Sequence, residues 1–165
     1  MQIEYSPFAL DIESNALLST ARSLGVAIVA YSPLGRGMLT GAYRSPSDLP
    51  SDDFRRFAPR FSEENFPKNL ELVEKIEAVA KRKGGGVTVG QVALAWLMKQ
   101  GEDVIPIPGT KKEKYLVENL GSLGVELTEG EEGEIREACE RAEVAGGRYP
   151  EGMGGILFAD TPELK

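Results

Sequence analysis

Residues 104–119 combine an apolar run with a cluster of lysines in a pattern that suits anion binding. The stretch reads VIPIPGTKKEKYLVEN, so a strand-like segment stops at Pro-Gly-Thr and three lysines follow among four residues. Gly109 lets the backbone approach a ligand closely, and the first turn of a helix offers N–H groups and a positive dipole end to a phosphate. A solvated helix start with ordinary surface lysines is the alternative, and this stretch alone leaves both open.

A second glycine-rich turn, AYSPLGRGMLTG at residues 30–41, follows another apolar run. Tyr31 ends that run, the glycines allow the chain to pass close to a ligand, and Arg36 is a candidate anion partner. Taken alone, the turn also fits a plain loop with a tyrosine that caps the core. Two such loops after successive strands favour a site, because the phosphate sites of (β/α)₈ barrels gather at the loops after strands seven and eight.

Two further stretches carry polar groups that chemistry can use. Gln2 lies in QIEYSP, where its amide could exchange a pair of hydrogen bonds with a carboxamide; an exposed residue at a fraying terminus is the alternative. Arg55, Arg56 and Arg60 lie in DFRRFAPRF, where we expect a solvated loop interleaved with aromatic residues. Contact of these arginines with a phosphate when the loop closes is the second possibility.

Composition narrows the classes of function. The chain of 165 residues has 19 basic and 26 acidic residues, a net charge of −7, so a wide basic surface for nucleic acid is not indicated and any anion site must be local. The sequence has one cysteine, Cys139, and no histidine, which predicts neither a disulfide framework nor a metal-ligand cluster. No apolar run is long enough for a membrane span, so we expect a soluble, cytoplasmic chain.

The elements that must position these stretches follow from periodicity and end signals. Apolar runs predict three strands, and apolar stripes with glycine or threonine boundaries predict the helices between and after them. The expected strands are 1–5, 26–31 and 104–107; the expected helices are 14–24, 68–83, one that starts after Thr88, one that ends near Leu123, and 128–143; residues 42–67 are expected to form a long irregular connection.

Strands that alternate with helices predict an α/β fold with about three parallel strands and flanking helices. Residues 1–145 are expected to form one unit and residues 146–165 an irregular, glycine-rich tail. Such a small sheet would leave both edges unpaired, so self-association through the open edges is expected to be possible.

In combination, these segments resemble the aldo-keto reductase family, whose members are NADPH-dependent reductases built on a (β/α)₈ barrel. The resemblance rests on QIEYSPF at 2–8, VAYSPLGRGMLTG at 29–41, ALAW at 93–96, IPIPGT with KYLVENLG over 105–121, and RYP at 148–150. Their order matches the sixth, seventh and eighth strands of the family's TIM barrel. The resemblance therefore implies that the chain forms the C-terminal part of such a barrel.

The resemblance implies a set of residues that bind NADP(H). Gln2 is similar to the glutamine that holds the nicotinamide carboxamide, and Tyr31 to the tyrosine that stacks on the nicotinamide ring. Loop residues similar to those that wrap the pyrophosphate are Ser32, Leu34 and Gly37. Residues similar to those around the 2′-phosphate are Ile107, Gly109, Thr110 and Lys111. Residues similar to the adenine-binding pair are Glu118 and Asn119, and Tyr115 replaces an arginine or glutamine of many relatives near the adenine.

The same resemblance implies that the catalytic residues lie outside this sequence. The family's Asp, Tyr, Lys and His tetrad is carried by early strands that have no counterpart here, and the sequence has no histidine. We therefore expect a C-terminal half begun at an internal or substituted methionine, which would act on a small carbonyl substrate only if an N-terminal half completed it. A non-catalytic NADP-binding fragment or pseudoenzyme is one alternative, and an inert product is another.

Overall fold

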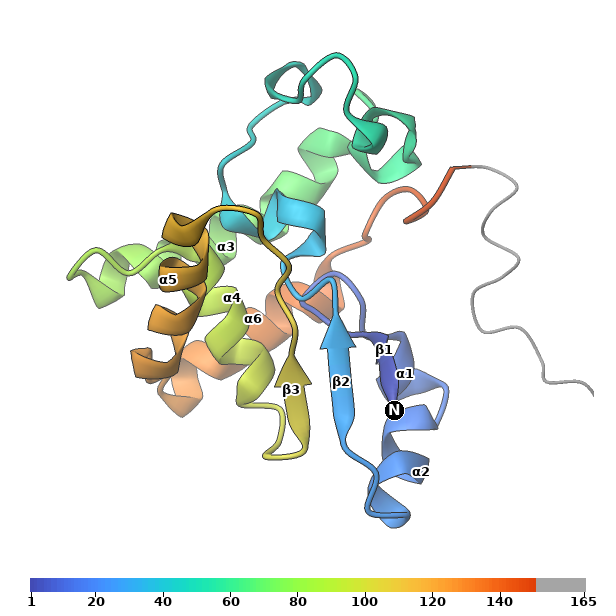
Figure 1. Ribbon diagram of the computed structural model, residues 1–165, viewed down its shortest axis with the longest axis vertical. Helices are drawn as coiled ribbons and strands as arrows, with labels where there is room; N and C mark the ends of the chain where they lie inside the picture. The colour runs from blue at the N-terminus through green and yellow to red at the C-terminus, as the bar shows by residue number, and fades with distance from the viewer. Residues whose placement is uncertain (151–165) are drawn as a thin grey trace, which may run out of the picture.

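Three short parallel strands form the centre of the molecule, which is a computed structural model that describes residues 1–150. The strands are β1 (Gln2–Glu4), β2 (Ile28–Tyr31) and β3 (Val104–Pro106), and they pair in the order β1-β2-β3 (Figure 1). The three expected strands are confirmed, each shorter than its apolar run. The order in space follows the order along the chain, as is usual for consecutive strands.

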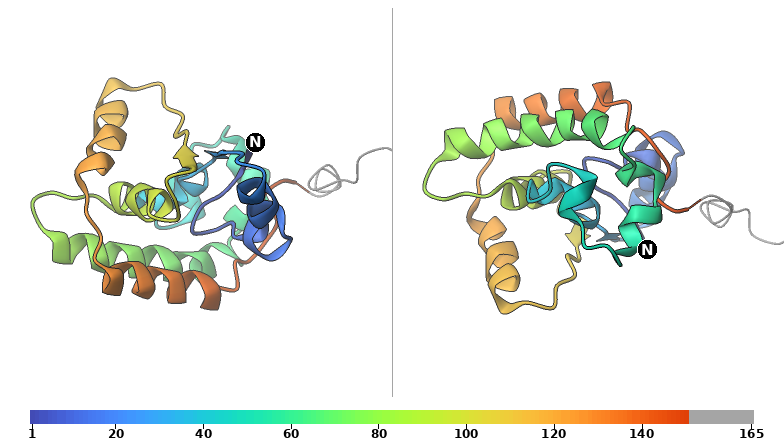
Figure 2. Two further views of the ribbon diagram at one scale, coloured as in Figure 1. Left: turned by 90° about the horizontal axis from the view of Figure 1, so that it is seen from below. Right: turned by 90° about the horizontal axis from the view of Figure 1, so that it is seen from above.

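Within residues 1–150, six α-helices flank this sheet. They are α1 (Asp11–Ser14), α2 (Leu17–Ser23), α3 (Phe66–Lys83), α4 (Val89–Met98), α5 (Glu113–Gly121) and α6 (Glu129–Arg141). Figure 2 shows α3 and α6 side by side in an outer layer, with α4 between that layer and the sheet. Short 3₁₀ turns occupy Gly35–Thr40, Pro46–Asp48, Phe54–Phe57, Pro59–Phe61 and Ser122–Gly124.

The central helix α4 is buried on nearly every side, as its almost continuous apolar sequence predicts. Its start is fixed by a capping box, in which the Gln91 N–H donates to Thr88 Oγ1 at 3.2 Å and the Thr88 N–H donates to Gln91 Oε1 at 3.0 Å. Thr128 and Glu131 cap α6 in the same way. Both helix starts confirm the prediction from sequence.

The helix expected over residues 14–24 is confirmed as α2, but it begins three residues later than expected, and a separate short helix, α1, precedes it. Ala16 takes the left-handed conformation, with φ of 64°, between the two helices. The Asn15 Oδ1 accepts a hydrogen bond from the Leu17 N–H at 3.1 Å and so caps the second helix. An asparagine that offers the backbone a local partner competes with continuation of the helix.

The sheet is open within the described residues. No strand of residues 1–150 pairs with the outer edge of β1 or of β3, and one face of the sheet packs against α4 while the other is only partly covered. Ile105 on β3 consequently exposes 50% of its surface. Residues 146–150 are irregular, as expected for the start of the tail, and the rest of the predicted tail lies outside the described residues.

Candidate functional site

The parallel register brings the carboxyl ends of the three strands to one edge of the sheet. Gln2 pairs with Val29, which pairs with Ile105, and Glu4 pairs with Tyr31. The loops that follow β2 and β3 therefore start side by side, above the arrowheads in Figure 1. In open parallel sheets and barrels, ligands bind at this carboxyl edge.

Three of the predicted site residues share the open face of the sheet. Side chains alternate between faces along a strand, and Ile28 and Ala30 of β2 are fully buried against the helices. Tyr31 therefore faces the open side, together with Gln2 two residues earlier in the register. Ile107 continues the same row, since its N–H donates to the Ala30 carbonyl at 3.0 Å.

The loop after β2 has an unusual backbone. Ser32 and Arg36 take positive φ values of 50° and 57°, although neither is a glycine, and Gly37 has φ of 94°. A Cβ added to Gly37 would lie 3.1 Å from Arg55 Nη1, so this position also needs a glycine for close packing. Positive φ at non-glycine residues costs of order 1 kcal/mol or more each and concentrates at ligand sites. The predicted pyrophosphate loop thus has the strained conformation typical of binding loops.

Leu34 of this loop and Glu118 of α5 meet over the N-terminus of α4. A Cβ built on Gly90 would lie 3.7 Å from Leu34 Cδ2 and 3.9 Å from Glu118 Oε1. The Gln91 Nε2 also donates to the Glu118 carbonyl at 2.9 Å, which holds α5 against α4. The structure thereby brings a residue predicted for the pyrophosphate close to one predicted for the adenine.

The loop after β3 corrects one detail of the sequence analysis. The helix begins at Glu113, with Lys112 as its N-cap residue, so Lys111 and Lys112 precede the helix instead of lying in its first turn. Thr110 Oγ1 accepts a hydrogen bond from the Lys112 N–H at 3.1 Å, and this local bond delays the start of the helix. A Cβ added to Gly109 would meet no atom within 4 Å, so the backbone there is open to an approaching anion.

The predicted adenine-binding positions lie on α5. The ammonium groups of Lys114 and Lys112 lie 4.6 and 5.8 Å from the centroid of the Tyr115 ring, so both lysines pack over this exposed aromatic ring. The backbone carbonyl of Asn119 accepts a hydrogen bond from Ser122 Oγ at 2.6 Å. The side-chain amide of Asn119 takes no part in this bond.

Tyr31 lies in a partly buried, charged environment. Burial above all, then the charge of Glu4 and the neighbouring phenol of Tyr149, raise the pKa of its phenol to about 12. A phenol with a raised pKa stays neutral at physiological pH. It therefore offers a neutral aromatic face.

The sequence analysis did not foresee a buried charge cluster at the end of β1. Glu4 is 3% and Arg60 7% exposed, and the guanidinium of Arg148 lies 3.5 Å from the carboxylate of Glu4. The expectation that Arg60 lies in a solvated loop is wrong, because its loop folds back over β1 and the start of the tail covers it. The only sequence signal was an arginine held between apolar neighbours in APRF.

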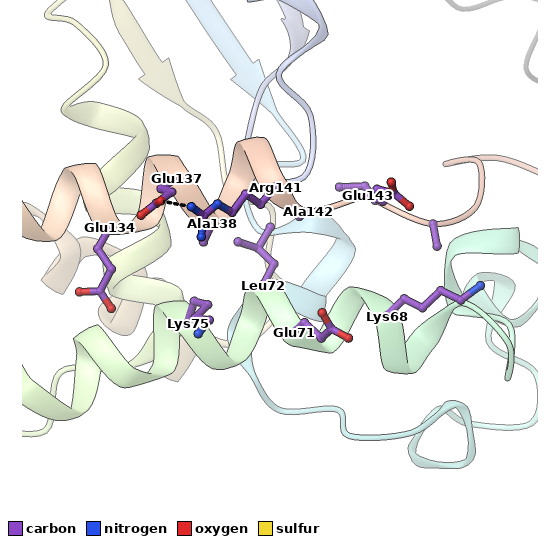
Figure 3. A pocket seen from close by; sticks show the side chains of 12 residues that line it. Lys68, Glu71, Leu72, Lys75, Glu134, Glu137, Ala138, Arg141, Ala142 and Glu143 are labelled. Carbon is purple, nitrogen blue, oxygen red and sulfur yellow. Dashed lines mark ion pairs between the residues drawn. The ribbon is translucent and has the colours of Figure 1, made fainter.

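The cavities lie elsewhere. One cavity of about 810 Å³ lies between α3 and α6 (Figure 3). Charged residues of both helices line it, together with the apolar Leu72 and Ala138. Another of about 540 Å³ lies beside α1. None of the predicted cofactor residues lines either cavity.

No helix within residues 1–150 combines the length and the apolar character needed to cross a lipid bilayer. The same part of the chain contains no group of three or more acidic, cysteine or histidine side chains placed to share a metal ion.

The geometry fits an elongated ligand along the carboxyl edge of the sheet. The open face at Tyr31 can take a flat ring, the strained loop after β2 can approach a diphosphate closely, and the loop at Gly109 and Lys111 leaves room for a further phosphate. These features suit the dinucleotide that the resemblance implies.

Comparison with known proteins shows the family of the chain. A family model described as aldo/keto reductase family matches residues 1–140. Over 99% of its length, the chain is 55% identical to the aldo-keto reductase yakc [NADP(+)] of Schizosaccharomyces pombe and 53% identical to the aldo-keto reductase str7 of Strobilurus tenacellus. The chain spans 48% of the length of each, about half.

A solved structure gives the same picture. The glycerol dehydrogenase AKR11B4 from Gluconobacter oxydans is 29% identical and superposes with a TM-score of 0.75 over 87% of this chain and 42% of that one. The three strands and their flanking helices are therefore those of part of a TIM barrel, with the sheet open instead of closed.

Proposed function

The chain belongs to the aldo/keto reductase family, and from this premise we propose that it is the NADP(H)-binding portion of a reductase that converts aldehydes or ketones to alcohols. The observation that carries the proposal is the parallel register, which puts Tyr31, the strained loop after β2 and the loop after β3 at one edge of the sheet. The name of the yeast relative, which includes NADP(+), supports the choice of cofactor.

Each predicted residue then has a physical role. Gln2 would hold the carboxamide of the nicotinamide and Tyr31 would stack on its ring, because both lie on the open face of the sheet. Lys111 would bind the 2′-phosphate as an exposed ammonium. Bound NADPH supplies the hydride; the chain's own residues bind and orient the cofactor.

Proton transfer to the carbonyl oxygen requires residues that we place outside this chain. The family tetrad expected from the resemblance includes a histidine, and this sequence has none. We therefore propose that the isolated chain binds NADP(H) without reducing a carbonyl compound, and that the complete reductase acts in the cytoplasm.

Titration of NADPH with the isolated chain, followed by nicotinamide fluorescence, tests the binding step. We expect saturable enhancement, a loss of affinity of about tenfold for NADPH in Lys111→Ala, and little change for NADH, because only NADPH carries the 2′-phosphate. Lys75→Ala is the matched control, since Lys75 lies on the outer helix α3. Equal losses for the two cofactors would remove Lys111 from the phosphate site, and absence of any binding would refute the proposal.

A further inference from the structure

Arg60 is a buried cation whose guanidinium has no hydrogen-bond partner among the described residues. Only 7% of it is exposed, yet its guanidinium makes no hydrogen bond or ion pair within residues 1–150, and its Nε is fully enclosed. The closest aromatic contact is the ring of Phe8, 5.6 Å from the guanidinium carbon. The Nε donor is therefore removed from water without a hydrogen-bond partner, and the charge of Glu4 offsets the buried positive charge only in part. Proteins rarely tolerate such a group without a functional reason.

The position of Arg60 is fixed by its backbone. Its N–H donates to the Gly147 carbonyl at 3.2 Å, and its own carbonyl accepts from Asn69 Nδ2 at 3.0 Å. Gly146 has φ of 81°, and a Cβ there would lie 2.6 Å from the carbonyl carbon of Pro59, so only glycine allows this close approach. The chain thus holds the guanidinium in place from both sides.

The charges around Arg60 leave an excess of positive charge. Arg36 and Arg148 lie close enough to lower its pKa, while Glu4 and Asp11 raise it, and burial as the largest effect lowers it to about 10. Three guanidinium groups therefore face two carboxylates. Both carboxylates are already engaged by Arg148, at 3.5 Å in the case of Glu4.

The cluster lies next to the predicted nicotinamide position. Glu4 pairs with Tyr31 in the register, and the Tyr31 phenol neighbours that of Tyr149. Arg36 links this segment to the β2 loop, because its Nη1 donates to the Arg148 carbonyl at 2.7 Å and its guanidinium lies 4.3 Å from the Tyr149 ring centroid. An anion bound here would sit beside the ring on which hydride transfer depends.

We propose that Arg60 binds the carboxylate of a small carbonyl substrate, so that the reductase acts on keto acids or aldehyde acids. A guanidinium pairs with a carboxylate through two parallel hydrogen bonds, which would satisfy the donors that the protein leaves free. The inference rests on the proposed function, since it names the substrate class of the same site.

The phosphates of the cofactor are a second source of an anion, but the fold favours the substrate. Arg60 belongs to the β1 side of the sheet, whereas Lys111 follows β3, and the two outer strands are separated by roughly 10 Å across β2. The 2′-phosphate position predicted at Lys111 therefore lies across β2 from Arg60. Whether Arg60 instead binds the diphosphate of the cofactor is tested below by adding NADPH in competition with the substrate anion.

The arginine Nε–H signals in ¹⁵N nuclear magnetic resonance spectra of the full chain provide the test. The Arg60 signal is assigned by its loss in Arg60→Met, and pyruvate is the probe, with methyl pyruvate as the uncharged control. We expect a saturable shift of the Arg60 signal with pyruvate and none with methyl pyruvate. Equal shifts with both compounds, or no shift with either, would overturn the proposal.

Stability distinguishes a binding role from a structural one. In Arg60→Met, we expect the thermal stabilisation by pyruvate to fall at least tenfold, with an unfolding midpoint that is unchanged or higher, because an uncompensated buried charge is removed. Arg141→Met, on the exposed face of α6, should leave both quantities unchanged. A lower midpoint with pyruvate stabilisation intact would show a structural arginine and contradict the proposal.

Saturating NADPH separates the inference from the proposed function. If pyruvate still shifts the Arg60 signal, the anion site is distinct from the cofactor site, as proposed. If NADPH abolishes the shift, Arg60 serves the cofactor phosphates and the proposal fails. If pyruvate binds at Arg60 but NADPH binds nowhere on the chain, the carboxylate site stands and the proposed cofactor function fails.

Discussion

On the β1 side of the molecule, side chains from several distant segments contact α6, the last helix of residues 1–150, whereas at the β3 edge α5 has none of its residues buried. Both edges carry helices with an apolar stripe, and both are built by the same chain. The difference lies in what covers each stripe within residues 1–150.

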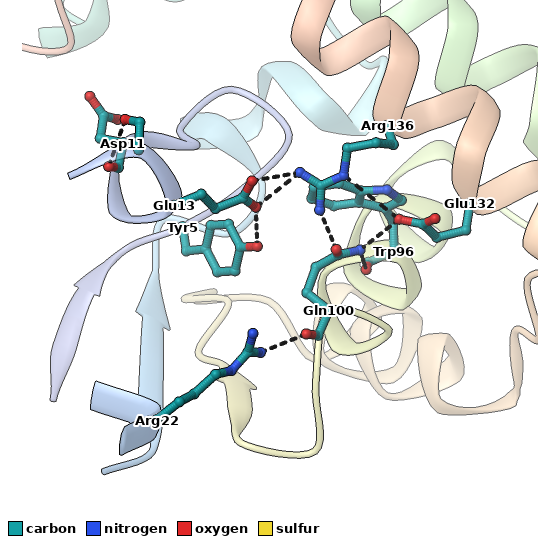
Figure 4. A network of polar contacts seen from close by, with 9 residues as sticks. Tyr5, Asp11, Glu13, Arg22, Trp96, Gln100, Glu132 and Arg136 are labelled. Carbon is teal, nitrogen blue, oxygen red and sulfur yellow. Dashed lines mark hydrogen bonds and ion pairs between the residues drawn. The ribbon is translucent and has the colours of Figure 1, made fainter. Parts of the chain in front are cut away.

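The β1 edge is tied by a network around Arg136 (Figure 4). Its Nη1 donates to both oxygens of Glu13 at 2.9 and 2.8 Å, its Nη2 donates to Gln100 Oε1, and its guanidinium lies 4.8 Å from the Trp96 ring centroid. The Tyr5 hydroxyl donates to the same Glu13 carboxylate. Residues from both ends of the described chain are thus held in one cluster.

The β3 edge lacks such a cover. Large apolar side chains of α5 and the turn after it stand exposed at i, i+1, i+4 and i+7: Leu116, Val117, Leu120 and Leu123. This spacing is typical of the apolar face of a helix that packs against another segment. The comparison teaches that an amphipathic pattern specifies a face, while a second segment decides whether that face is buried.

Among the substitutions considered, Ile135→Ala on α6 is expected to lower the free energy of unfolding the most. Ile135 has 0% exposure and packs in the core, so removing its side chain beyond Cβ should cost about 2–5 kcal/mol of unfolding free energy. Urea denaturation followed by circular dichroism measures this. A loss below about 1 kcal/mol would mean that the layer formed by α3 and α6 is loosely packed in solution, and the contrast between the two edges would disappear.

A smaller loss is expected from Arg136→Met, which keeps the aliphatic stem and removes the donors. Glu13 and Gln100 would each lose a charged partner, so we expect about 1–3 kcal/mol of destabilisation in the same denaturation experiment. Arg141→Met is the control, because its pair with Glu137 is exposed and should contribute less than about 0.5 kcal/mol. Equal effects for the two variants would show that the network adds nothing beyond surface pairing.

Features that depend on neighbouring residues were predictable from the sequence. The capping boxes at Thr88 and Thr128 each need only two residues three apart, and the strands follow from short apolar runs. Parallel pairing, and with it the common edge of the candidate site, followed from the alternation of strands and helices.

Features that depend on distant segments were not predictable. The burial of Arg60 requires Gly146 and Gly147 to return to its loop, and no local pattern announces that contact. The positive φ of Ser32 and Arg36 was equally hidden, because sequence rules assign such backbone conformations to glycine. The predicted roles of the cofactor residues remain predictions that the titrations above will test.

Alkaline pH should weaken the β1 edge selectively. Burial, followed by the hydrogen bond to Glu13 and its charge, raises the pKa of Tyr5, while Arg136 lowers it. A folded-state pKa above the unfolded value near 10 gives stability that is present below pH 10 and is lost as the pH rises further. The contribution of Tyr5 alone should therefore lower the unfolding free energy by about 1 kcal/mol between pH 10 and 11.

In Tyr5→Phe, this decline should become shallower. Tyr31, whose pKa is raised to about 12, contributes to the same pH range, so Tyr31→Phe is the matched comparison. Denaturation midpoints at pH 8, 10 and 11 would measure the difference. A slope that neither variant changes would mean that other groups control alkaline unfolding.

The smallest effect is expected from Leu120→Ala on α5, and it bears most directly on the contrast between the edges. Leu120 is 57% exposed, so truncation should change the unfolding free energy by less than about 0.5 kcal/mol, against several for Ile135→Ala. Sedimentation velocity of the same samples reports self-association, which we propose as a consequence of the open edges. If Leu120→Ala instead costs 2 kcal/mol or more and also shifts the chain from dimer to monomer, a second copy covers α5 in solution. A large cost in a chain that stays monomeric would show that α5 packs against its own fold, and the contrast argued from exposure would be wrong.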